Sequence, residues 1–82
     1  MKSMFRKYVI IDSTPILFSN DLIHASVADA YLGKVKSAGF FLVAKNNLNM
    51  EVICFGESTS LKIKSRPQID AAIILRFLKE LN

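Results

Sequence analysis

The residues most capable of chemistry are scattered along the chain of 82 residues. The polar side chains that could take part in catalysis are Asp12, Ser13, His24, Ser37, Cys54, Glu57, Ser58 and Ser60. A catalytic nucleophile needs a general base within hydrogen-bond distance and a third group that orients this base. No spacing among these side chains favours one such combination over another. The sequence therefore predicts no catalytic residue, and a small hydrolase-type enzyme is the least favoured class of function.

His24 is the only histidine of the chain and Cys54 is the only cysteine. Metal sites usually draw several His and Cys ligands from short, regular spacings, which this sequence lacks. Cys54 stands within the apolar run 52–55, which predicts a buried and unreactive thiol. A single cysteine allows no disulfide within the chain, and this favours a reducing compartment. We expect no metal and no cofactor. Cys54 is predicted in the core, and His24 is predicted half-buried at the edge of the apolar face of the first helix, with a structural or solvent-facing role.

The most site-like stretch is a hydroxyl-rich turn at 56–60, followed by several cations and the start of a helix. Together with two lysines of an earlier strand, its candidate anion- or nucleic-acid-binding residues are Lys34, Lys36, Ser58, Ser60, Lys62, Lys64 and Arg66. Basic side chains attract phosphates, and a helix N-terminus offers unpaired backbone N–H groups. However, the spacing is not that of a phosphate-binding loop, and Pro67 removes one N–H donor. A hairpin turn with a solvated strand face is the favoured interpretation.

The formal net charge of +4 helps the chain to meet polyanions but gives no specificity. Phe40, Phe41 and Phe55 lie in apolar runs, where burial is more common than stacking on bases. A weak, basic nucleic-acid or phosphate-anion binding module is therefore the alternative function.

The elements that must position these residues are two helices and several strands. Strands are predicted at 8–12, 15–19, 35–44, 50–57 and 61–64, with turns at 12–15 and 45–49. A helix is expected to begin near Ser19 or Asn20 and to end at Ala28 or Gly33. The order ββαβββα predicts a single α+β domain over residues 1–82, in which two helices pack on one face of a mainly antiparallel sheet.

The second helix is the clearest element of the sequence. Ser65 and Gln68 have the spacing of a capping box, with Pro67 in the first turn. At helical periodicity its apolar face consists of Ala71, Ile74, Leu75, Phe77, Leu78 and Leu81. Ile69 and Ile73 fall instead among the charged residues, where water is expected. We interpret them as candidate interface residues.

Hydrophobic residues make up 51% of this small chain, more than one core of this size can bury. The surplus favours a partner surface, and a second copy of the chain is the commonest partner. The basic residues at 1–7 are not followed by a long apolar segment, and no run is long enough for a membrane span. We expect a cytoplasmic, self-associating interaction or accessory module without catalytic activity and without a membrane partner.

Overall fold

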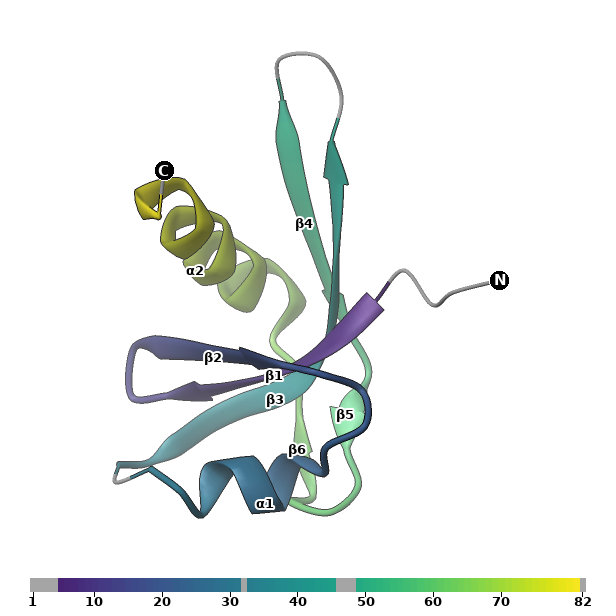
Figure 1. The fold of residues 1–82 in the computed structure, drawn as a ribbon, viewed down its shortest axis with the longest axis vertical. Helices are drawn as coiled ribbons and strands as arrows, with labels where there is room; N and C mark the ends of the chain where they lie inside the picture. The colour runs from purple at the N-terminus through teal and green to yellow at the C-terminus, as the bar shows by residue number, and fades with distance from the viewer. Residues whose placement is uncertain (1–4, 32, 46–48, 82) are drawn as a thin grey trace.

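A four-stranded antiparallel sheet forms the centre of the molecule (Figure 1). The computed structural model describes residues 5–31, 33–45 and 49–81. The strands of the sheet, in the spatial order β2-β1-β3-β4, are β1 (Phe5–Ile11), β2 (Thr14–Phe18), β3 (Val35–Lys45) and β4 (Met50–Phe55). The remaining elements are a hairpin of β5 (Glu57–Ser58) and β6 (Ile63–Lys64), and the helices α1 (His24–Ala28) and α2 (Pro67–Glu80). This confirms the predicted α+β class and the mainly antiparallel sheet.

The two helices lie on opposite faces of the sheet, not on one face as expected. Tyr8 and Ile10 of β1 join the core under α2, whereas the alternate residues Val9 and Ile11 belong to a second core. That second core is completed by Val27 of α1 and by the β5–β6 region. The reason is that β1 is apolar at consecutive positions, so both of its faces need cover.

Helix α2 presents most of the predicted face to the sheet, except Leu81, which is 66% exposed, and it begins differently. Ile74 is fully buried, and the half-buried Ala71, Leu75 and Leu78 pack around the same core. The predicted capping box is wrong, because no side chain caps the helix at its N-cap residue Arg66. The hydroxyl of Ser65 instead donates a hydrogen bond to the carbonyl of Gly56, at 2.8 Å.

Two glycines explain the course of β3 and β4. Gly39 lies so close to its neighbours that an added Cβ would stand 2.6 Å from the carbonyl oxygen of Phe55. Gly56 has a φ of 77°, which favours glycine and separates β4 from β5 where one strand was predicted. The predicted turn at 45–49 falls mostly outside the described residues. No helix within the described ranges is long and apolar enough to cross a membrane.

Candidate functional site: the Asp70 cluster and the outer face of the sheet

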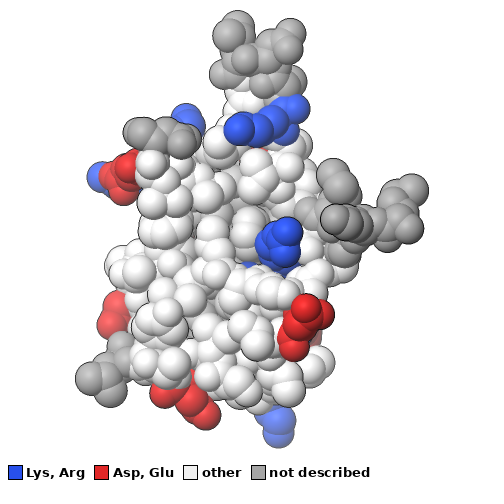
Figure 2. Space-filling view, in the orientation of Figure 1, with Lys and Arg blue, Asp and Glu red and all other residues white. Residues whose placement is uncertain are grey.

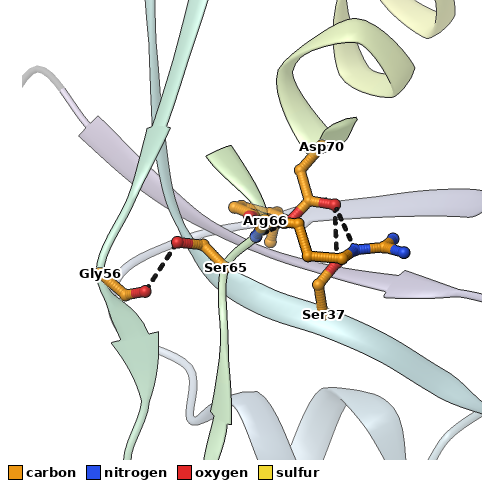
Figure 3. Close-up of polar contacts among 6 residues, drawn as sticks. Ser37, Gly56, Ser65, Arg66 and Asp70 are labelled. Carbon is orange, nitrogen blue, oxygen red and sulfur yellow. Dashed lines mark hydrogen bonds and ion pairs between the residues drawn. The ribbon is translucent and has the colours of Figure 1, made fainter. Parts of the chain in front are cut away.

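The carboxylate of Asp70 is completely buried at the start of α2. Its Oδ1 accepts hydrogen bonds from the hydroxyl of Ser37 at 2.7 Å and from Nε of Arg66 at 3.1 Å (Figure 3). Its Oδ2 accepts from the backbone N–H of Arg66 at 2.8 Å and from the hydroxyl of Tyr8 at 2.5 Å. A buried carboxylate is stable only when such donors surround it, and here there are four.

We define the Asp70 cluster as Tyr8, Ser37, Arg66 and Asp70, and its hydrogen bonds connect three elements. Tyr8 comes from the centre of β1, Ser37 from β3, and Arg66 from the residue before α2. By accepting the backbone N–H of Arg66, Asp70 also satisfies one donor that a capping side chain would normally satisfy. Burial, followed by the hydrogen bond to Asp70, raises the pKa of Tyr8 far above its usual value. The phenol therefore stays protonated and acts as a donor.

The sequence did not single out Asp70. The one available signal is its position one helical turn before Ile74, on the face that packs against the sheet. A carboxylate at that position predicts a buried acid, but nothing in the sequence identifies Tyr8 or Ser37 as its partners.

Cys54 is buried in β4, as predicted. Burial raises the pKa of its thiol to about 11. The thiolate is the reactive form of cysteine, so at neutral pH this group is a poor nucleophile and a poor metal ligand.

His24 is buried between aromatic rings and is only 4% exposed. Its ring stands edge-on to Phe18 and Phe40, with centroid distances of 5.4 and 5.7 Å. Its Nε2 lies 2.9 Å from the carbonyl oxygen of Gly39, which can only accept, so Nε2 carries the proton. Burial lowers the pKa of the imidazole. No group of three His, Cys, Asp or Glu residues suited to a metal ion occurs in the described part of the chain.

The hydroxyls of the predicted anion site are used to hold the turn together. Ser58 is fully buried, and its oxygen accepts the backbone N–H of Leu61 at 3.1 Å. Ser60 accepts the backbone N–H of Ala25 in α1, also at 3.1 Å. Arg66 directs its Nε to Asp70. These contacts leave the three residues with structural roles.

The predicted lysines remain at the surface. Lys34, Lys36, Lys62 and Lys64 are all exposed. Lys64 stands opposite the acidic Glu57 in the β5–β6 hairpin. Figure 2 shows one face of the molecule, on which charged side chains are few, include both signs and stand mostly near the margin. The basic surplus is not concentrated on that face.

Large apolar side chains lie on the face of the sheet that α2 does not cover. We call this the outer-face patch and define it as Phe5, Leu42, Ile53 and Phe55. Phe5 pairs with Leu42 across β1 and β3, and Leu42 pairs with Ile53 across β3 and β4. Phe5, Ile53 and Phe55 are 36, 43 and 36% exposed. A patch of this kind marks an interaction surface more often than isolated exposed residues do.

The aromatic members of the patch support one another. The ring of Phe5 is 5.6 Å from that of Phe55, and both contact the ring of Phe40, at 5.5 and 5.8 Å. Such contacts hold large side chains in place before any partner binds. The sequence missed this surface because β4 is apolar at nearly every position, and its pattern alone did not show which side is uncovered.

The two isoleucines predicted at an interface differ in their surroundings. Ile69 is 55% exposed. Ile73 is half-buried and packs against the core under α2. It also lines a shallow pocket between α2 and the β1–β2 turn, with Pro15 and Phe77. The chain itself therefore covers part of Ile73, whereas Ile69 faces outward.

Searches of protein-family models, of curated proteins and of solved structures found no significant match to this chain, so its function is argued from the geometry alone.

Proposed function

We propose that this chain is a protein-interaction module that self-associates, without a catalytic activity of its own, in a reducing compartment such as the cytoplasm. The observation that carries the proposal is the outer-face patch, which leaves Phe5, Ile53 and Phe55 more than one-third exposed in a domain of only 82 residues. A second copy is the favoured partner, because most oligomers are symmetric assemblies of one chain.

The state of the chemically capable groups supports a binding role. Asp70 is surrounded by donors, and the thiol of Cys54 is held in its protonated form. Nε2 of His24 is occupied by the carbonyl of Gly39. Each of these groups stabilises the fold in its present state and would need new surroundings before it could act on a substrate.

The energy of burying the patch is of the same size as the cost of association. Full burial of a Leu, Ile or Phe side chain contributes about 1.5–3 kcal/mol. Since these side chains are already more than half buried, both patches together contribute on the order of 5–10 kcal/mol. Association itself costs about 4–15 kcal/mol. We therefore expect a dimer of moderate stability that a single charge in the patch can dissociate.

Sedimentation of two lysine variants tests the proposal. Ile53→Lys places a charge in the outer-face patch, whereas Ile69→Lys places the same charge on the exposed flank of α2. We expect the unmodified protein and Ile69→Lys to sediment as dimers at tens of micromolar, and Ile53→Lys to sediment as a folded monomer. Ile73→Lys is a poorer probe, because Ile73 packs against the core.

The opposite result for the two variants would place the interface on α2 instead of the outer-face patch. In that case Ile69→Lys would dissociate and Ile53→Lys would not. An unmodified protein that is monomeric at high micromolar concentration would overturn the proposal of self-association. Nucleic-acid or phosphate binding stays a secondary alternative, because Ser58, Ser60 and Arg66 already make contacts within the fold.

A further inference from the structure

Resting on the proposed self-association, we propose that two copies pack their outer-face patches together about a two-fold axis, so that Lys7 of each copy meets Glu51 of the other. The occupant of the patch is thus a second copy of this chain. Charged residues at two opposite corners of the patch carry this inference.

The strand register fixes where these charges stand. Phe5, Leu42 and Ile53 form one row across β1, β3 and β4. Lys7 lies two residues beyond Phe5 on β1, and Glu51 lies two residues before Ile53 on β4. Side chains two positions apart on a strand share a face, so both charges border the patch.

Lys7 and Glu51 lie on opposite sides of Leu42. Lys7 pairs with Phe40, which precedes Leu42 on β3, whereas Glu51 pairs with Ala44, which follows it. The two charges also stand on the two outer strands of this three-stranded region, β1 and β4. Leu42 is therefore at the centre of a diagonal that begins with a cation and ends with an anion.

A symmetric interface makes this diagonal self-complementary. In a two-fold dimer, each contact between one residue and another is made twice. Consider a two-fold axis that lies between the two facing sheets, passes over Leu42 and is perpendicular to this diagonal. Rotation about this axis exchanges the two ends of the diagonal. Each Lys7 then faces the Glu51 of the other copy, and Leu42 faces Leu42. Opposite charges at both ends favour this register over other arrangements.

The geometry also predicts how the sheets cross. Strands are about 4.8 Å apart, and two residues along a strand span about 6.8 Å. With these spacings, the axis makes the strands of the two sheets cross at about 70°, close to the orthogonal class of sheet packing. Lys7 is half-buried, and its Nζ already donates to the carbonyl of Leu22 at 2.8 Å. The ammonium group is therefore held beside the patch, with further N–H donors for a carboxylate.

Charge reversal tests the pairing. We expect Lys7→Glu and Glu51→Lys each to raise the dimer Kd at least tenfold at low salt, because like charges then meet twice. A mixture of the two single variants should form a mixed dimer with a Kd within about threefold of the unmodified one. In that mixed dimer, two acidic side chains of one copy face two basic side chains of the other. The double variant should recover in the same way.

Lys45→Glu is the matched control, because the alternation along β3 places Lys45 on the opposite face from Leu42. We expect its Kd to stay within twofold. Circular dichroism checks that every variant is folded. This matters most for Lys7→Glu, which loses the hydrogen bond from Lys7 to the carbonyl of Leu22. Kd is read from sedimentation equilibrium.

The outcomes separate this inference from the proposed function. A dimer whose Kd is unchanged in both single variants would overturn the pairing of Lys7 with Glu51 and leave self-association standing. A dimer could instead form by pairing of the two β4 strands, since β4 lies at the edge of the sheet. In that case Glu51→Lys would weaken the dimer, and mixing it with Lys7→Glu would not restore the Kd. That result would also overturn the pairing of Lys7 with Glu51. A monomeric unmodified protein would overturn both.

Discussion

The carboxylate of Asp70 accepts four hydrogen bonds, two at each of its oxygens. Only a group with two acceptor oxygens can accept all four. Ser37, Tyr8 and Arg66 all donate to it. An amide in its place offers one acceptor oxygen and brings two donors of its own. At least one of the four donors would then meet another donor instead of an acceptor.

We therefore expect Asp70→Asn to lower the free energy of unfolding by about 2–4 kcal/mol, as measured by urea denaturation. Tyr8→Phe is the graded comparison, because it removes one hydrogen bond to the carboxylate and should cost about 1.5–3 kcal/mol. A loss below about 0.5 kcal/mol for Asp70→Asn would show that the cluster is not a major source of stability.

His24 gives the protein a predictable response to mild acid. Burial lowers the pKa of its imidazole below the ordinary value of 6.5, so the folded state resists protonation while the unfolded state does not. As the pH falls below 6.5, the unfolded state binds more protons and the fold loses stability. The stability that the neutral imidazole of His24 contributes is fully present above pH 6.5. It is lost as the pH falls from 6.5 through the lower pKa that His24 has in the folded state.

We expect the unmodified protein to lose more stability between about pH 7.5 and pH 5.5 than His24→Gln, which keeps an N–H donor but does not titrate. Denaturant titrations of both proteins at the two pH values give the difference, because the two proteins differ only at position 24. Equal pH dependence would mean that His24 is protonated as readily in the folded state as in the unfolded state.

For single residues, the sequence predicted burial better than it predicted hydrogen-bond partners. The apolar neighbours of Cys54 correctly predicted a buried thiol. His24 was expected at the edge of a helix face, whereas it is enclosed by Phe18 and Phe40. Two partners of Asp70, Tyr8 and Ser37, come from distant segments, and no local pattern encodes such contacts. Folding brings them together through the packing of α2 on the sheet.

Among the elements, β3 depends most on a single small residue. A Cβ on Gly39 would meet the carbonyl oxygen of Phe55 at 2.6 Å and the Cβ of Ser65 at 3.1 Å. The first of these atoms belongs to the backbone of β4 and cannot move aside like a flexible side chain. We expect Gly39→Ala to lower the free energy of unfolding by about 1–3 kcal/mol, measured by thermal or urea denaturation. An unchanged stability would show that β3 and β4 separate at little cost.

The elements themselves were mostly predictable, and the exceptions have physical causes. Apolar and β-branched runs, with the turn residues between them, placed β1 to β4, and helical periodicity placed α2. The predicted start of α1 near Ser19 or Asn20 is wrong, because the helix begins at His24 after an uncapped Ile23, and it ends at Ala28, the earlier of its two predicted limits. Its side of the sheet could not be predicted, because β1 is apolar on both faces. The break at Gly56 follows from a positive φ, which is invisible in an apolar run.

The molecule as a whole carries a net charge of +4, and four of its lysines, Lys34, Lys36, Lys62 and Lys64, are exposed. Its exposed lysines should attract phosphates only through general electrostatics. We expect any affinity for random DNA or RNA to be weak and to fall at least tenfold between about 50 and 200 mM salt, as measured by fluorescence anisotropy. Sequence-selective binding that survives high salt would show that a base-reading surface was missed.

The hydrogen bond between Tyr8 and Asp70 joins positions that are 62 residues apart in the chain. During translation, the ribosome makes β1 first and reaches Asp70 about 3–12 s later, at roughly 5–20 residues per second. Until then, the face of the sheet under α2 has no cover, and the nascent chain exposes Tyr8 and Ile10. A ribosome that stalls before Asp70 therefore carries a sheet with one bare face, which is a substrate for chaperones and proteases instead of a folded domain.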